Sequence, residues 1–75
     1  MVKLTRVSGA EAVSALERLG FVVVRQRGSH LVLKKKTPAG DIGTVIPMHR
    51  ELAIGTIRGI IRQAGITVEE FLGNL

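Results

Sequence analysis

The stretch that decides the fold of this chain reads Arg25-Gln26-Arg27-Gly28-Ser29-His30-Leu31-Val32-Leu33-Lys34-Lys35-Lys36. It holds five of the eleven Lys and Arg residues of the chain and no acidic residue. Apolar, β-prone runs at 21–24 and 31–33 flank its Gly-Ser pair, and two such runs joined by a short glycine-containing connection predict a β-hairpin. The hairpin is basic on both arms and carries beside its turn a histidine, the side chain that titrates near neutral pH. We therefore expect this ribbon to contact phosphate.

Helical patterns lie on both sides of the hairpin. Ser8 stands three residues before Glu11, the spacing of a capping box, and predicts a helix near 9–19 that ends at Gly20. An apolar stripe predicts a second helix near 55–64. Gly55-Thr56 is expected to begin this helix and Gly65 to end it. Strands are expected near 21–26, 30–36 and 43–47. A capping box of Thr67 and Glu70 predicts a last helical turn to about Leu72.

The order of these elements predicts an α+β fold, α-β-β-β-α, with a three-stranded antiparallel sheet and both helices on one face. Short connections between consecutive strands favour an antiparallel meander. Strand alternation places Lys35 with the leucines toward the helices, and His30, Val32, Lys34 and Lys36 on the open face. Gly59, inside a helix, suggests close packing against a neighbour. The expected buried residues are Leu16, Leu31, Leu33, Val45, Ile57, Ile60 and Ile61.

Composition limits the class of protein. Seventy-five residues make a single domain, 1–75, and the absence of cysteine excludes disulfides and thiolate metal sites. The net charge of +5 and the pI near 10.9 favour a polyanionic partner, although such a charge also serves solubility alone. No apolar run reaches the length of a membrane span and the N-terminus lacks the pattern of a signal peptide, so we expect a cytoplasmic protein without a membrane partner. The two histidines and scattered carboxylates form no ligand cluster, and we expect no metal and no cofactor.

The basic hairpin has the residue types that metal-free RNA cleavage needs. His30 can take the proton of a 2′-hydroxyl, and Arg25, Arg27 and Lys34 can stabilise the negative charge of the phosphorane. Lys36 extends the basic strip along the strand, and a Gly28-Ser29 turn lets a phosphate approach the backbone. The alternative reading of His30 is a half-exposed strand residue with no task. His49, after Pro47, is either a second acid–base group, a residue that orients a phosphate, or a loop histidine that only caps or packs.

Several stretches, in this order, resemble the HicA toxins of bacterial and archaeal toxin–antitoxin systems. None of them is diagnostic alone, but together they cover nearly the whole chain. They are Val7-Ser8-Gly9, Leu19-Gly20-Phe21, Arg27-Gly28-Ser29-His30, Val45-Ile46-Pro47-Met48-His49, residues 55–66 and Val68-Glu69-Glu70-Phe71.

The resemblance implies a fold similar to a double-stranded-RNA-binding domain and an activity, cleavage of messenger RNA. It also implies a protein partner, a HicB-type antitoxin that covers the active surface. The histidine that follows Gly-Ser in the family is the catalytic one and corresponds to His30. Many relatives carry a polar or aromatic residue directly after that histidine, where this chain has Leu31. A second hypothesis is a noncatalytic module that holds structured RNA by shape and charge.

Overall fold

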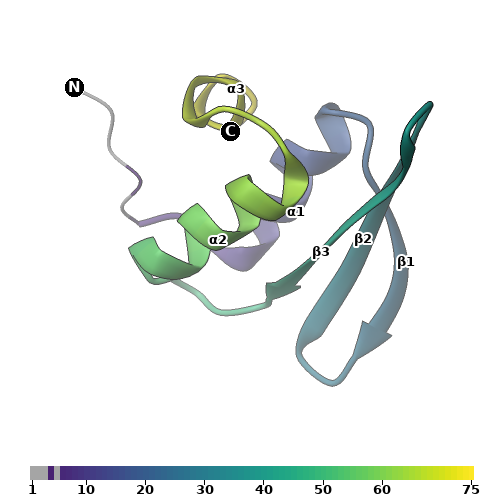
Figure 1. The fold of residues 1–75 in the computed structure, drawn as a ribbon. Helices are drawn as coiled ribbons and strands as arrows, with labels where there is room; N and C mark the ends of the chain where they lie inside the picture. Colours follow the sequence, from purple (N-terminus) through teal and green to yellow (C-terminus); the bar gives the residue numbers. More distant parts are fainter. Residues whose placement is uncertain (1–3, 5) are drawn as a thin grey trace.

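The computed structural model describes residue 4 and residues 6–75, which form a helix, a three-stranded sheet and two further helices (Figure 1). The strands pair antiparallel in the order β1-β2-β3, and the helices pack on one face of the sheet. The predicted α+β fold is confirmed. The bounds of the elements are α1 Gly9–Arg18, β1 Val22–Arg27, β2 His30–Thr37, β3 Gly40–Pro47, α2 Ile54–Ala64 and α3 Val68–Gly73.

The second hairpin is tighter than the sequence suggested. Thr37 pairs with Gly40, so only Pro38 and Ala39 form the turn and β3 begins earlier than position 43. The Thr37 hydroxyl donates a hydrogen bond to the Gly40 carbonyl and closes this turn. The added length makes β3 match β2 along its whole extent.

The N-terminal segment, where we expected no signal peptide, lies largely outside the described residues. Within the described part of the chain, no helix is long and apolar enough to cross a membrane.

The hydrogen bonds at the helix ends show which of the predicted capping residues cap their helices. Ser8 Oγ accepts a hydrogen bond from the Glu11 amide at 3.0 Å, and Glu11 Oε1 accepts one from the Ser8 amide at 2.9 Å, which confirms the capping box of α1. The same reciprocal pair joins Thr67 and Glu70 at the start of α3. The predicted start of α2 was wrong, because its N-cap is Ala53, which makes no side-chain hydrogen bond. Burial of the apolar stripe of α2 against the sheet therefore stabilises this helix start without a polar cap.

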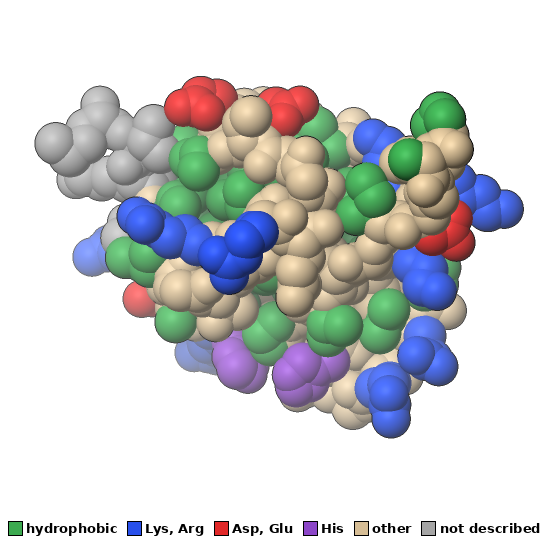
Figure 2. All heavy atoms as spheres, in the orientation of Figure 1, with side chains coloured by type: hydrophobic (Ala, Val, Ile, Leu, Met, Phe, Trp, Pro, Cys, Tyr) green, Lys and Arg blue, Asp and Glu red, His purple; other side chains and the backbone are tan. Residues whose placement is uncertain are grey.

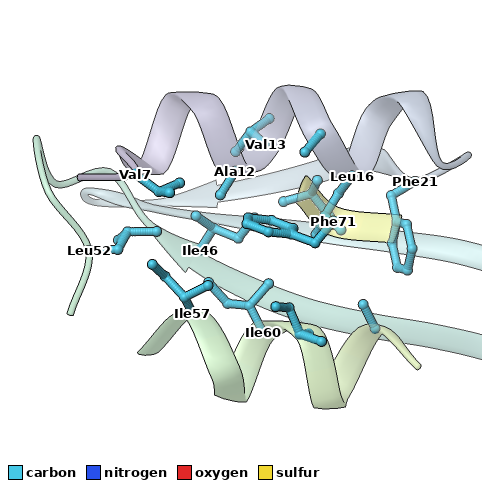
Figure 3. Close-up of a cluster of buried hydrophobic side chains, with 14 of the residues drawn as sticks. Val7, Ala12, Val13, Leu16, Phe21, Ile46, Leu52, Ile57, Ile60 and Phe71 are labelled. Atoms are coloured by element: carbon cyan, nitrogen blue, oxygen red, sulfur yellow. The ribbon is translucent and has the colours of Figure 1, made fainter. Parts of the chain in front are cut away.

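The core lies between the sheet and the helices, where Leu16, Ile46 and Phe71 point inward (Figure 3). Leu33 is fully buried, as the alternation of β2 predicted. Leu31 was also predicted to be buried, but it is only half-buried against the same cluster. The predicted burial of Val45 was wrong, since its side chain is 45% exposed. Of the other residues predicted to be buried, Leu16, Ile57, Ile60 and Ile61 are confirmed.

The register of β3 explains the exposure of Val45. Leu33 pairs with Thr44, and cross-strand partners in an antiparallel sheet share a face. Thr44 therefore faces the helices, together with Ile46, and Val45 faces the open side. The buried Thr44 hydroxyl donates a hydrogen bond of 2.7 Å to Gln63 Oε1 on α2, and this contact fixes the position of α2 over β3.

A glycine does mark a close approach in this fold, but it is Gly9 and not Gly59. A Cβ at Gly9 would collide with the carbonyl oxygen of Pro47 and the Cα of Met48. The prediction for Gly59 was wrong, since a Cβ there would meet nothing within 4 Å. The start of α1 thus lies directly against the loop that follows β3, and only glycine permits this distance.

The two glycines give a matched pair of variants. We expect Gly9→Ala to lower the free energy of unfolding by about 1–3 kcal/mol, because backbone atoms on both sides must shift to admit the methyl group. Gly59→Ala should raise the free energy of unfolding by up to ~1 kcal/mol, since alanine is the better residue in an uncrowded helix interior. Urea unfolding of both variants measures the two values. A Gly9→Ala variant at least as stable as the wild type would contradict the close packing assigned to Gly9.

Candidate nucleic-acid interface

The turn between β1 and β2 sets the position of His30. Gly28 has a φ of 58°, and a glycine with positive φ at the first central position is the pattern of a type II′ hairpin turn. The Gln26 side chain donates a hydrogen bond of 3.0 Å to the Gly28 carbonyl, which holds the turn from β1. A Cβ at Gly28 would meet nothing within 4 Å, so the backbone here is open to an approaching group. His30 is the first residue of β2 and is exposed beside this turn.

A β-bulge in β1 decides where its two arginines point. Val23 pairs with Leu33 but Arg25 pairs with Val32, so Val24 is an extra residue in the strand. Without the bulge, strict alternation would place Arg25 on the helix side with Val23. With it, Arg25 and Arg27 lie on the same face as Val32 and His30, their cross-strand partners.

The open face therefore carries most of the residues predicted to form the site. His30 and Arg27 are cross-strand neighbours, and Arg25 lies two positions from Arg27 on the same face. Lys34 and Lys36 follow on β2, exposed at the opposite end of this face. Figure 2 shows both histidines at one margin of the molecule, with Lys and Arg side chains beside them. The structure thus brings one imidazole and two guanidinium groups together at the turn, with the two lysines further along β2.

Lys35 does not belong to this surface. Its ammonium donates a hydrogen bond of 2.8 Å to the Leu19 carbonyl at the end of α1, and it lies 5.9 Å from the centre of the Phe21 ring. A cation at this position satisfies a free carbonyl of the helix end and interacts favourably with the helix dipole. Of three consecutive lysines, the middle one is therefore structural, as its place on the leucine side of β2 indicated.

Two backbone hydrogen bonds bring His49 to the same end of the sheet. The Met48 amide donates to the Ser29 carbonyl at 2.7 Å, and the Gly9 amide donates to the His49 carbonyl at 2.9 Å. Since His30 also pairs with Pro47, the loop after β3 is fixed against the hairpin turn, and Figure 2 shows the two histidine side chains close together. Sequence reasoning did not find this neighbourhood. Its only signal was Gly9, which permits the loop to approach α1.

The arrangement offers acid–base groups and fixed positive charge on an exposed surface. Both histidines are exposed, so a substrate can reach either imidazole from solvent. Among the described residues, no group of three or more His, Cys, Asp or Glu side chains lies together as a metal site would require. An imidazole beside guanidinium groups on an open sheet face is suited to a phosphate ester of a long polymer, which no deep pocket could admit.

The fold and this face define a small α+β domain whose open sheet surface is basic. The family model described as HicA toxin of bacterial toxin–antitoxin systems matches residues 9–66, from the start of α1 past the end of α2. The chain therefore belongs to the HicA toxin family, whose known members are mRNA interferases, and membership implies an antitoxin partner. No curated protein has a significant sequence match to the chain.

The role of Lys35 can be tested against its neighbour. Lys35→Ala should lower the free energy of unfolding by about 1–2 kcal/mol, because it removes a charged hydrogen bond to a helix end and a contact with an aromatic ring. Lys36→Ala should change it by less than about 0.5 kcal/mol, since Lys36 is exposed. Thermal and urea unfolding measure both values. Equal losses in the two variants would show that the Leu19 contact contributes nothing.

Proposed function

We propose that this chain is an endoribonuclease toxin that cuts messenger RNA with His30, without a metal ion, and that a HicB-type antitoxin inhibits it. The observation that carries the proposal is the position of His30. In a chain of the HicA family, the histidine after the Gly-Ser turn lies exposed on the open face with Arg25 and Arg27. Three groups suited to phosphate chemistry thus converge from two strands.

His30 is the proposed general base. Its neutral imidazole takes the proton of a ribose 2′-hydroxyl as the 2′-oxygen forms a bond to the adjacent phosphorus. The guanidinium groups of Arg25 and Arg27 then stabilise the negative charge that develops on the non-bridging oxygens. Both arginines are exposed, and the bulge at Val24 places them on the His30 side of the sheet.

His49 is the proposed general acid. As the bond between phosphorus and the 5′-oxygen breaks, an imidazolium proton passes to that oxygen, leaving a 2′,3′-cyclic phosphate and a 5′-hydroxyl. Two histidines in opposite protonation states are a sufficient pair for this reaction. The hydrogen bonds from Met48 to Ser29 and from Gly9 to His49 support the assignment, since they fix the loop beside His30 through backbone atoms alone.

Lys34 and Lys36 are proposed to hold the RNA backbone. Lys34 is four residues from His30 along β2, about 13 Å at the rise of a strand, so a bound RNA would cross the sheet from the turn toward the lysines. The open backbone at Gly28 and Ser29 allows a phosphate to approach closely at the other end. Recognition would rest mainly on phosphate contacts, because both phenylalanines are buried and the chain has no Tyr or Trp for base stacking.

The base can be tested by its products and by one substitution. We expect cleavage of an end-labelled RNA to continue in EDTA and to leave 2′,3′-cyclic or 3′-phosphate ends with 5′-hydroxyls. His30→Ala should reduce the rate at least ~100-fold, the contribution typical of a general base. Since His30 is exposed, the urea midpoint of the variant should equal that of the wild type.

The same variant separates the enzyme from a noncatalytic RNA-binding module. His30→Ala should retain RNA binding with an unchanged dependence on salt, because the phosphate contacts remain. An intact wild-type chain that binds RNA but never cuts it would favour the binding module. Products with 5′-phosphates, or full activity in His30→Ala, would contradict the assignment of His30.

The acid can be tested with a substrate that needs none. An RNA whose scissile 5′-oxygen is replaced by sulfur releases a thiolate, which leaves without a proton. His49→Ala should slow cleavage of ordinary RNA ~100-fold but of the thio-substituted RNA less than about 10-fold, whereas His30→Ala stays slow on both. Single-turnover rates measure the four combinations. Equal defects of His49→Ala on both substrates would assign His49 to binding or to loop structure.

A further inference from the structure

The outer edge of β1 is unusually accessible for a strand in so small a sheet. All six residues of β1 are exposed, and no other strand in the described part of the chain pairs with the edge opposite β2. Figure 1 shows why: α2 lies next to β3, and β1 forms the side of the sheet away from it. An unpaired strand edge presents a row of free amides and carbonyls that can pair with another chain.

The half of this edge nearest α1 carries no charged side chain to protect it. Val22, Val23 and Val24 are 59%, 40% and 50% exposed, three consecutive valines open to solvent. Charges and bulges discourage edge pairing. Here Arg25 and Arg27 protect the half near the turn, and the bulge at Val24 lies where that half meets the valines. The valine half is free to accept an added strand.

A groove lies on the open face beside these valines. It has a volume of about 450 Å³ and is apolar along β1, where Val22 and Val24 line it. Lys34 and Lys36 provide exposed positive charge, and Asp41 is the cross-strand partner of Lys36. The other lining residues are Gly20 and Lys35. An apolar wall facing a basic wall suits an occupant with alternating apolar and acidic side chains.

The charge and composition of this edge and groove favour one of three possible occupants, which are a second copy of the chain, an RNA strand and a segment of another protein. A second copy of this chain would bring another basic hairpin against the groove, with no acidic residue anywhere in residues 21–36 to pair with its lysines. An RNA strand would gain little from the valines, since its phosphates need donors and its bases need aromatic or polar partners. An acidic protein segment in extended conformation matches the strand edge, the valines and the lysines at once.

We propose that the valine edge, defined as residues 22–24 with the adjoining groove, binds an acidic, extended segment of a partner protein by strand addition to β1. The identification of that partner as the antitoxin rests on the proposed function. Backbone pairing would supply affinity, while the valines and lysines would select side chains on one face of the segment. Because the segment would cover Lys34 and Lys36, its binding would displace RNA from the sheet.

The test uses a synthetic nine-residue peptide of alternating valine and glutamate, titrated into isotope-labelled His30→Ala chain and followed by NMR. We expect shifts and slowed hydrogen exchange at the amides of residues 22–24, together with release of a bound twelve-nucleotide RNA. Val22→Thr/Val24→Thr keeps the shape and charge of the edge but removes apolar contact, and should weaken peptide binding about tenfold. Ile54→Thr is the matched control, since Ile54 is 45% exposed on α2 and should leave binding unchanged.

Each other outcome overturns the proposal. Equal binding of a valine–lysine peptide would show that charge selects nothing, and shifts centred on α2 would place the docking surface elsewhere. Protection of residues 22–24 by the RNA alone, with the same loss in the threonine variant, would assign the edge to nucleic acid. Self-association through β1 in sedimentation would assign it to a second copy. Since binding is measured on a His30 variant, its failure is distinct from a failure of the nuclease proposal, which cleavage by the wild type decides.

Discussion

Burial of Leu33 beneath the helices is the constraint on which the rest of the structure depends. Strand side chains alternate with a period of two, so a slip of one residue would carry the histidine into the core and the leucines into water. Leu33 is fully buried against the same cluster as Ile46 and Phe71. The hydrophobic effect, acting on the leucine side of β2, thereby exposes His30 on the other side. Burial of one side of β2 therefore leaves the site on its other side exposed to solvent.

Backbone geometry determines which other side chains lie near His30. The bulge at Val24 turns two arginines to the face of His30, and the hydrogen bond from Met48 to Ser29 brings the loop of His49 to the same end of the sheet. The bulge and the loop contact are formed by backbone atoms, and the proposed catalytic side chains take no part in them. Replacement of an imidazole should therefore change the chemistry and leave the scaffold intact, which is the condition for clean mutational tests in a domain of 75 residues.

The open face combines two kinds of surface that serve different partners. Around the turn it carries an imidazole and guanidinium groups, whereas along β1 it carries exposed valines beside lysines. Phosphate esters favour the first and a protein strand the second. The two surfaces share Lys34 and Lys36 in our proposals, so occupation of one would reduce access to the other. Inhibition of such a toxin would then need no conformational change, because competition for the same lysines suffices.

Local signals in the sequence determined the elements of this protein and the orientation of β2. Capping boxes, helix-ending glycines and the Gly-Ser turn act over a few residues, and alternation alone assigned Leu33 to the core and His30 to the open side. The same alternation placed Lys35 on the side of the leucines, away from its two neighbours. Because these effects depend on adjacent residues, the fold class and the basic, histidine-bearing face could be predicted without tertiary information.

Only the tertiary structure decided which residues meet across the sheet. Val45 and Ile46 are both apolar and β-prone, so the sequence alone does not show which of them faces the helices. The pairing of β3 with β2 decides this. The bulge at Val24 and the approach of Gly9 to Pro47 likewise depend on partners distant in sequence. Pairing register and close packing are set by the whole domain at once, and for this reason the proximity of the two histidines emerged from the fold and not from the chain.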